Sequence, residues 1–227
     1  QKIADKYNLK VIYDAAHAFG VRKNGLSVLN YGDLSVLSFH AIKVFSTIEG
    51  GAVICHSAEM KNRLDNIKNF GIISETEVTE PGINAKLNEL QSAFGLMQLK
   101  YVNQSIDKRK ELVLIYRSQL ENIPGVKYFD DCENITPNYS YFPILIDEKK
   151  YGSSRNSLYE KLKMHDIYSR RYFYPLISDF EPYNKLPGSE ISNIPVATRI
   201  AQQILCLPLY TELSELDVIR ICSLIKN

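Results

Sequence analysis

Cysteine is scarce in this sequence, and the few cysteines lie far apart. The chain of 227 residues contains Cys55, Cys132, Cys206 and Cys222, and no two of them have the C-x-x-C spacing of a zinc site. This scarcity excludes a dense disulfide framework and gives no reason to expect a bound metal. No apolar run reaches the length of a membrane-spanning helix. We therefore expect a protein of the reducing cytoplasm that does not enter a membrane.

An excess of charge of one sign is also lacking. The sequence carries 27 basic and 26 acidic residues, a formal net charge of +1. This near-balance argues against a dedicated nucleic-acid surface and against a polybasic membrane anchor. Hydrophobic residues make up 45% and charged residues 23%, which is ordinary for a globular protein of one large domain or two small ones.

The first residues lack an initiating methionine, since the sequence begins QKIADKYNLKVIYDAAHAFG. Residues 1–7 are typical of the last turns of a helix, and residues 9–13 predict a buried strand directly after it. Such a start resembles the middle of an α/β domain. We therefore expect a piece of a longer protein, in which a targeting signal would not be readable.

Short apolar runs alternate with turns and helical segments in the first part of the chain. The predicted strands are residues 34–40 and 50–56, and the predicted helices are residues 57–71, 87–102 and 105–123. Continuous apolar strands predict a sheet that is covered on both faces. Ser57 is a suitable N-cap for a helix that ends at Gly71, and Pro124 breaks the last helical pattern.

The pattern after Pro124 is that of a small α+β domain. Its predicted strands are residues 126–129, 139–147 and 167–176, and its predicted helices are residues 152–166, 195–205 and 214–226. The last of these strands is expected to run into a Pro-containing loop. We thus expect three parts, which are an α/β part over residues 1–105, a linking helix over residues 106–124, and a small domain over residues 125–227.

One lysine has unusual neighbours. The stretch SFHAIKVFSTIEGGA, residues 38–52, places Lys43 among mostly apolar side chains. Most lysines are solvated surface residues, and that interpretation stays open here. The alternative is a partly desolvated amine that can act as a nucleophile toward a carbonyl.

Polar side chains follow two of the predicted strands. Asp14 and His17 follow the first, in YDAAHAFG, and Ser38 ends the second, five residues before Lys43. Ligands of open α/β sheets collect at the carboxyl ends of strands, although helix capping would explain Asp14 taken alone. Pyridoxal 5′-phosphate needs a lysine for its Schiff base, a carboxylate at its pyridine nitrogen and a donor to its phosphate. The four residues suit that cofactor.

Three ordered motifs, VIYDAAHAFG, GDLSVLSFHAIKVFSTIEGGA and GINAKLNELQSAFGLMQL, resemble the DegT/DnrJ/EryC1/StrS family of sugar aminotransferases. The resemblance continues through SRRYFYPLIS to LCLPLYTEL and covers essentially the whole chain. It implies a fold type I α/β enzyme that uses pyridoxal phosphate, with residues 1–105 as the C-terminal part of the cofactor-binding large domain. Within the family, the chain is most similar to transaminases of dTDP-linked keto-deoxyhexoses, although Ile42 replaces the usual threonine beside the lysine.

The resemblance also implies roles for individual residues. Lys43 matches the Schiff-base lysine, and Asp14 matches the partner of the pyridinium nitrogen. His17 lies where the family has a histidine or glutamine against the cofactor ring. Ser38 matches a phosphate contact, and Asn84 matches an asparagine that reaches the phosphate of the neighbouring subunit.

The resemblance places substrate contacts in the C-terminal part. Arg170 and Tyr172 fall in a segment that approaches the substrate in relatives, while ordinary strand residues at a domain surface are an equal alternative. Lys43 favours amino transfer, because sugar dehydratase members carry histidine at that position. The expected reaction moves an amino group from an amino acid, with glutamate as the expected donor, to a nucleotide-linked keto-sugar.

A homodimer with shared active sites is a further implication, and the apolar helix after Asn84 offers a surface for it. Family members also have an N-terminal portion, absent from this sequence, that supplies the main phosphate site and an aromatic residue over the cofactor ring. Two interpretations therefore stay open. The chain is part of a longer enzyme, or it is a non-catalytic or assembly subunit in which these motifs serve packing and dimer contact.

Overall fold

The computed structural model describes residues 1–226, which form two compact units. The first unit contains residues 1–106 and 131–138, and the second contains residues 107–130 and the chain from Tyr139 onward. The first boundary falls inside one long helix, α4 (Val102–Leu120). The first unit is therefore not continuous in sequence, because a short later segment returns to it.

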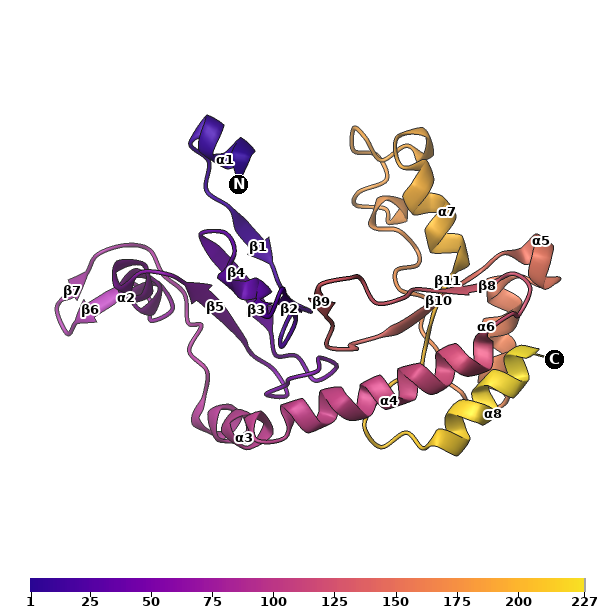
Figure 1. Cartoon of the computed structure of the whole chain (residues 1–227). Coiled ribbons are helices and arrows are strands. Elements are labelled where there is room, and N and C mark those ends of the chain that lie inside the picture. Colours follow the sequence, from indigo (N-terminus) through magenta and orange to yellow (C-terminus); the bar gives the residue numbers. More distant parts are fainter. Residues whose placement is uncertain (227) are drawn as a thin grey trace. The chain divides into compact units, whose positions relative to one another are not determined.

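The first unit consists of short strands and three further α-helices (Figure 1). Its elements are α1 (Lys2–Tyr7), β1 (Ile12–Asp14), β2 (Arg22–Lys23), β3 (Leu26–Ser27), η1 (Val28–Asn30), β4 (Leu34–Ser38), β5 (Gly51–Cys55), α2 (Ala58–Ile67), β6 (Ile72–Ser74), β7 (Glu77–Val78), α3 (Glu89–Leu99) and β9 (Ile135–Thr136). The predicted strands and helices of this part are present, while the two- and three-residue strands β2, β3, β6, β7 and β9 were not expected.

The main sheet of the first unit has the order β1-β4-β5. Strands β1 and β4 are parallel, with Asp14 opposite Val36, and β5 is antiparallel to β4, with Gly51 opposite Ser38. Because β1 and β4 run in the same direction, their carboxyl ends meet at one edge of the sheet. Asp14 and Ser38, the last residues of these strands, therefore share that edge.

The expectation of a buried first strand is wrong for this chain. Ile12 of β1 is 63% exposed, and Leu9 and Tyr13 are also exposed. In β4 the pattern alternates, with Leu37 buried and Val36 exposed, so one face of the sheet is uncovered. A continuous apolar run shows that a strand suits burial on both faces, but nothing in the run says which segment covers it.

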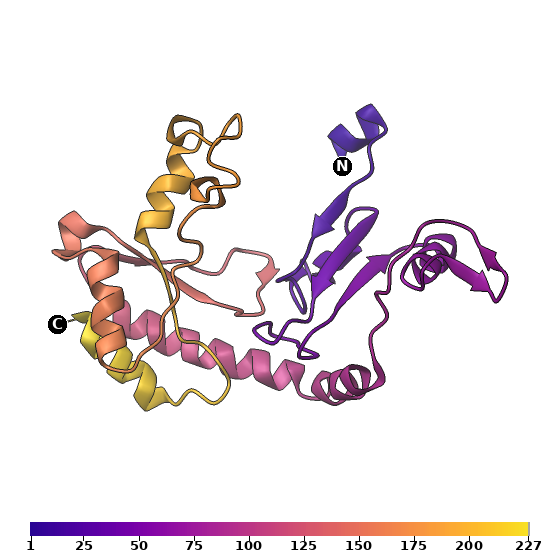
Figure 2. The ribbon, with the colours of Figure 1, turned by 180° about the vertical axis from the view of Figure 1, so that it is seen from behind.

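Helix α2 begins as its sequence predicts. The Ser57 hydroxyl accepts a hydrogen bond from the backbone N–H of Met60, the N-cap arrangement. The helix ends at Ile67, earlier than the expected end at Gly71. Gly71 has φ +75° and lies so close to the carbonyl of Glu80 that a Cβ could not fit there. From both sides of the molecule, α2 is seen beside the β6–β7 hairpin (Figures 1 and 2).

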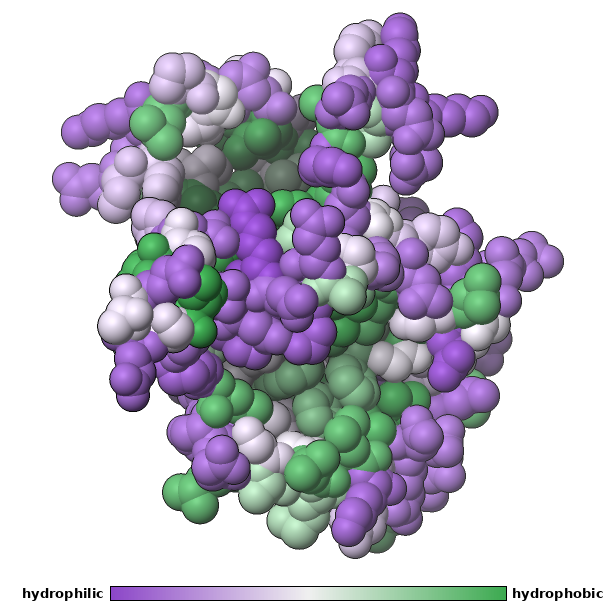
Figure 3. All heavy atoms as spheres, turned by 90° about the vertical axis from the view of Figure 1, so that its left-hand side faces the viewer, coloured by the Kyte–Doolittle hydropathy of each residue, from purple (hydrophilic) through white to green (hydrophobic). Residues whose placement is uncertain are grey.

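Helix α3 leaves large apolar side chains uncovered. Leu90 is 84% exposed and Leu96 is 67% exposed, and Met97 and Leu99 are also exposed. Figure 3 faces the side of the molecule that carries α2 and α3, and hydrophobic side chains gather on the lower part of that view. Exposed apolar surface of this extent is typical of an interaction site.

The second unit has one antiparallel sheet of order β11-β10-β8, with helices around it. Its elements are residues 107–120 of α4, β8 (Val126–Tyr128), β10 (Phe142–Ile146), α5 (Glu148–Tyr151), α6 (Arg155–Met164), η2 (Ile177–Asp179), η3 (Ile191–Asn193), α7 (Pro195–Gln203), β11 (Ile204–Leu207) and α8 (Glu215–Lys226). In residues 1–226, every helix is too short or too polar to cross a lipid bilayer.

The core of the second unit lies between α4, α8 and the sheet. Tyr116 of α4 is fully buried, its ring stacks on Phe142 at 4.8 Å between centroids, and its hydroxyl donates to the carbonyl of Pro208 at 2.9 Å. Val218 and Cys222 of α8 are buried as well. A buried tyrosine hydroxyl needs such a partner, so this bond ties α4 to the segment before α8.

Two expectations for the second unit are wrong. Residues 167–176 do not form a strand, because only Arg170 pairs with the sheet, through Cys206 of β11. Pro175 lacks an N–H to continue the pairing.

The helix expected over residues 195–205 ends at Gln203, and β11 begins at Ile204 because this apolar run pairs with β10. A short apolar run fits a helix and a strand equally well, so its pattern could not decide.

Candidate functional site

Lys43 lies in the loop between β4 and β5, which is closed at its base by backbone hydrogen bonds. The N–H of Phe39 donates to the carbonyl of Gly50 at 2.8 Å, and the N–H of Thr47 donates to the carbonyl of Phe39 at 2.9 Å. Inside the loop, the N–H of Lys43 donates to the carbonyl of His40 at 2.9 Å. The backbone that carries the amine is therefore fixed on both sides.

Three phenylalanine rings pack beneath this loop. The ring of Phe19 stacks on that of Phe45 at 4.5 Å between centroids, and Phe39 meets Phe45 edge to face at 4.8 Å. Phe45 is 5% exposed, and Thr47 is also buried. Phe39 and Phe45 belong to the sequence motif around Lys43. The apolar residues of that motif therefore form the packing that supports the loop.

The structure brings together two of the predicted site residues. Nζ of Lys43 lies 3.0 Å from Nε2 of His17 and 3.4 Å from Nδ1 of the same ring. Lys43 is half-buried, whereas His17 is exposed. An amine in this setting is held in one place and is still accessible to a ligand.

The electrostatics of His17 follow from its neighbours. Partial burial lowers the pKa of the imidazole below its ordinary value, and the positive charge of Lys43 lowers it further. The Asp14 carboxylate acts in the opposite direction and raises the pKa of His17. The ring is therefore mainly neutral near pH 7, and a neutral ring can accept a hydrogen bond from the Lys43 amine.

Asp14 and Ser38 occupy the same edge of the sheet. Oδ1 of Asp14 accepts a hydrogen bond from the N–H of Ala16 at 3.1 Å, and the Ser38 hydroxyl accepts from the N–H of His40 at 3.4 Å. Each contact orders the turn after its own strand. Asp14 also lines a cavity of about 320 Å³, together with Tyr13, Ala15, Ala18, Lys23, Val28, Tyr31 and Ser35.

Asn84 lies apart from this group of residues. It is exposed, its backbone pairs with Asn69 after α2, and its side-chain oxygen accepts a hydrogen bond from Lys86 at 3.0 Å. The structure therefore brings His17 to Lys43 and places Asp14 where its charge acts on His17, with Asp14 and Ser38 at the same sheet edge. The contacts of Asn84 are with other residues.

A buried side chain that the sequence did not single out supports the His17 segment. The side-chain nitrogen of Asn138 donates to the carbonyls of His17 and Phe19, at 2.8 Å each. Its only sequence signal was a glycosylation-like Asn-Tyr-Ser pattern, which does not predict such a contact.

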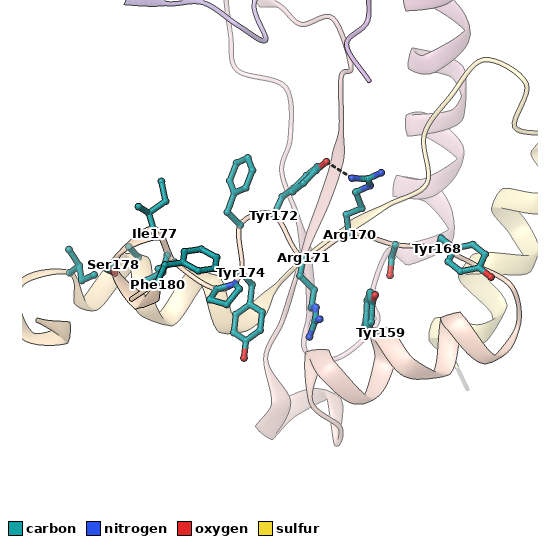
Figure 4. Close-up of a pocket in the computed structure, with 15 residues that line it drawn as sticks. Tyr159, Tyr168, Arg170, Arg171, Tyr172, Tyr174, Ile177, Ser178 and Phe180 are labelled. Atoms are coloured by element: carbon teal, nitrogen blue, oxygen red, sulfur yellow. Dashed lines mark hydrogen bonds between the residues drawn. The ribbon is translucent and has the colours of Figure 1, made fainter. Parts of the chain in front are cut away.

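The other two predicted residues line a pocket of the second unit. Arg170 donates a hydrogen bond from a guanidinium nitrogen to the hydroxyl of Tyr172 at 3.0 Å, the dashed contact in Figure 4. The Tyr172 ring meets Tyr141 edge to face at 5.3 Å. The pocket has a volume of about 980 Å³, and its lining comes mainly from residues 168–178.

Arg171 points to the other side of the same segment (Figure 4). Its guanidinium lies over the rings of Tyr159 and Tyr174, at 4.4 and 5.0 Å from their centroids. This contact and a hydrogen bond to Asn156 at 3.2 Å give Arg171 a packing role. The side chains of Arg170 and Tyr172 therefore point in a different direction from that of Arg171.

The donor set at the sheet edge suits one type of cofactor. A half-buried amine, a carboxylate and a hydroxyl are groups that suit pyridoxal phosphate, and the imidazole lies beside the amine. Within residues 1–226, no cluster of His, Cys, Asp and Glu could hold a metal ion.

Comparison with known proteins also indicates an aminotransferase. A sequence profile of the DegT/DnrJ/EryC1/StrS aminotransferase family matches residues 1–226. The dTDP-4-amino-4,6-dideoxy-D-glucose transaminase of Shigella dysenteriae is 50% identical over 212 residues, which are 93% of this chain and 57% of that protein. The Escherichia coli protein of the same name is 48% identical over 226 residues, which are 99% of this chain and 61% of that protein. The chain thus spans 57–61% of the length of these relatives.

Solved structures share the fold. The crystal structure of DesI in the presence of its TDP-sugar product superposes with a TM-score of 0.90 at 33% identity, covering 99% of this chain and 57% of that one. Helicobacter pylori PseC, an aminotransferase of pseudoaminic acid biosynthesis, gives a TM-score of 0.89 at 27% identity, covering 99% and 60%. The expected aminotransferase fold is therefore confirmed.

Proposed function

Because the chain belongs to the DegT/DnrJ/EryC1/StrS aminotransferase family, whose members depend on pyridoxal phosphate, we propose that it transfers an amino group from glutamate to a nucleotide-linked keto-deoxysugar. The names of the transaminases at 50% and 48% identity support a dTDP-linked sugar as the acceptor. The observation that carries the proposal is the 3.0 Å approach of the Lys43 amine to the His17 ring at the carboxyl edge of the sheet.

Lys43 has the central role in this proposal. Its amine would hold the cofactor at its aldehyde, and Nζ would carry the proton to and from the reacting carbon. When bound, pyridoxal phosphate supplies the electron sink for that carbon. The neutral His17 ring accepts a hydrogen bond from Nζ and so holds the amine in position.

The remaining residues of the sheet edge bind and orient. The Asp14 carboxylate would provide the negative charge that keeps the pyridine nitrogen protonated, and the Ser38 hydroxyl would donate to the phosphate. In the second unit, Arg170 and Tyr172 are proposed to contact the substrate. A guanidinium hydrogen-bonded to a tyrosine hydroxyl offers donors to a sugar hydroxyl or a phosphate oxygen.

Reductive trapping tests the proposal. The protein is incubated with pyridoxal phosphate and reduced with borohydride, and its peptides are analysed by mass spectrometry. We expect stoichiometric labelling of Lys43, loss of that label in Lys43→Ala, and retention of it in Lys2→Ala, which removes an exposed lysine of the same unit. Glutamate and a dTDP-linked keto-sugar should then yield 2-oxoglutarate. A protein that leaves Lys43 unlabelled would contradict the proposal and favour the alternative, a non-catalytic fragment or assembly subunit.

A homodimer with shared sites is the second part of the proposal. Asn84 is exposed and lies far from Lys43 along the chain, just before α3 with its exposed Leu90 and Leu96. A second copy is the occupant that we propose for this apolar surface, and it would bring Asn84 to the phosphate of its partner.

Subunit mixing tests the shared site. Inactive Lys43→Ala subunits are mixed with inactive Asn84→Ala subunits, under conditions that allow exchange. If sites are shared, mixed dimers regain one intact site and part of the activity. If each site is confined to one chain, no activity returns.

A further inference from the structure

Asn138 is a buried polar side chain with a specific task. It is 5% exposed, and its one NH₂ group donates to two carbonyls, those of His17 and Phe19, at 2.8 Å each. A side-chain amide has two N–H donors, and both are used. The partners are more than a hundred residues away in sequence, so the contact joins two distant parts of the chain.

The position of Asn138 is fixed by sheet pairing. Strand β9 pairs with β2 in an antiparallel manner, with Thr136 opposite Arg22. The N–H of Asn24 also donates to the carbonyl of Asn134 at 2.8 Å. The segment from 131 to 138 is therefore attached to the first unit before it presents the Asn138 amide to the turn.

The two carbonyls belong to His17 and Phe19, and each of these residues contacts the Lys43 loop through its own side chain. The His17 ring meets Nζ of Lys43 at 3.0 Å, and the Phe19 ring stacks on Phe45 at 4.5 Å. Phe45 lies two residues after Lys43 in the same loop. A shift of the backbone at residues 17–19 would thus move the imidazole and the packing beneath the lysine together.

We propose that Asn138 is a positioning residue, which sets the His17 imidazole against the Lys43 amine by holding the carbonyls of residues 17 and 19. In this role it acts through the backbone of the turn. Its importance for amino transfer rests on the function proposed above, whereas its effect on the His17–Lys43 geometry does not.

The alternative is that Asn138 serves stability alone. Two part-buried carbonyls that lost their donor would cost folding free energy wherever they lay. That alternative predicts a less stable protein with an unchanged site. The two ideas therefore differ in what happens to His17 in a folded variant.

The first experiment needs no cofactor. The ring protons of the four histidines are titrated by NMR, and His17 is assigned from the spectrum of His17→Gln. In the wild type, burial and Lys43 hold the pKa of His17 below 6.5, against the opposing effect of Asp14. In Asn138→Ala, we expect that pKa to move back toward 6.5, because the ring leaves the amine and gains solvent.

A matched control separates positioning from stability. Leu158→Ala removes a fully buried side chain of the second unit and lowers stability without touching residues 17–19. We expect it to leave the pKa of His17 unchanged. Should Asn138→Ala fail to fold, Asn138→Ser keeps one hydroxyl donor and takes its place. A folded Asn138 variant with the wild-type pKa of His17 would overturn the proposal.

A second experiment connects the geometry to chemistry. In Asn138→Asp, the carboxylate cannot donate and faces two carbonyl oxygens, so the turn should be displaced until the acid is protonated. We expect the rate of borohydride trapping of pyridoxal phosphate at Lys43 to fall about tenfold or more, with partial recovery at acidic pH. Equal trapping rates in wild type and variant would contradict the positioning role. If the wild type itself is not trapped, the proposed function fails and the NMR result still decides the role of Asn138.

Discussion

Nζ of Lys43 lies 3.0 Å from Nε2 of His17, so two groups that can both be cationic are in direct contact. Like charges at this distance repel, and the structure avoids the repulsion because the pKa of His17 is lowered. The imidazole is then an acceptor for the amine. Three of the predictions below follow from this pair.

Replacing Lys43 with methionine should abolish labelling by pyridoxal phosphate and change the free energy of unfolding by less than about 1 kcal/mol, since half-exposed polar contacts contribute little to stability. Loss of the neighbouring positive charge should also raise the pKa of His17. NMR titration and urea unfolding measure both effects. An unchanged pKa of His17 would show that the contact is absent in solution.

Asp14→Asn should have the opposite effect on the pKa of His17. The amide retains an oxygen that can accept from the N–H of Ala16, so the turn should persist, but the negative charge is lost. The pKa of His17 should therefore fall further. Trapping at Lys43 should survive, while the amino-transfer rate should drop by several orders of magnitude, because the pyridine nitrogen is no longer kept protonated. Near-normal turnover would reduce Asp14 to a capping residue.

The pH dependence of stability should include a contribution from His17. Its pKa is lower in the folded protein than in the unfolded chain, so the unfolded state binds a proton first as the pH falls. The contribution is fully present above the unfolded value of 6.5 and is lost as the pH falls through the folded value. Urea unfolding between about pH 7.5 and about pH 5 should show a larger loss for wild type than for His17→Gln. Equal losses would contradict a lowered pKa.

Gly95 of α3 packs against the buried Thr47. A Cβ at this glycine would lie 2.8 Å from Cγ2 of Thr47 and 3.7 Å from the Phe45 ring. Overpacking of this kind costs about 1–3 kcal/mol, which exceeds the helix-propensity gain of about 1 kcal/mol from alanine. Gly95→Ala should therefore lower the melting temperature. Adding Thr47→Ser removes Cγ2, keeps the hydroxyl that donates to the carbonyl of Glu49, and should restore stability. A double variant no more stable than Gly95→Ala would refute this packing.

Thiol labelling tests the core of the second unit. Cys132 is exposed, whereas Cys222 is buried in α8 and burial raises its pKa to about 12. Cys206 of β11 is buried too, with a pKa raised to about 11. Since the thiolate is the reactive form, Cys132 should react in the native protein and the two buried thiols only after unfolding. Rapid native labelling of Cys222 would contradict the packing of α8.

Much of the candidate site could be predicted because its residues follow strands. Asp14 and Ser38 end two apolar runs, and parallel strands bring such ends to one edge. His17 follows the first of these strands and Lys43 follows the second, so their proximity was also within reach of the sequence. The small second domain was predicted less well, because the aromatic run around Tyr172 has strand propensity but packs through its rings.

Asn138 could not be predicted, and the reason is physical. The strand that delivers it, β9, has two residues and therefore no readable period. Its pairing with β2 is a long-range contact that depends on the fold of both segments. The exposure of β1 was missed for a similar reason. An apolar run predicts that a strand favours burial, but it does not show which other segment packs against it.

Residues 131–138 belong to the first unit although they follow α4 in the sequence. This arrangement affects how homologous genes can recombine. Homologous genes often exchange blocks by recombination, and a crossover inside the codons for α4 looks like a natural place to swap one unit for another. Here such an exchange would also replace β9 and Asn138, because both are encoded beyond α4. The turn at His17 would then come from one parent and the amide that holds it from the other. We expect these two stretches to be inherited as a pair, and chimaeras that keep them together to fold better than those that divide them.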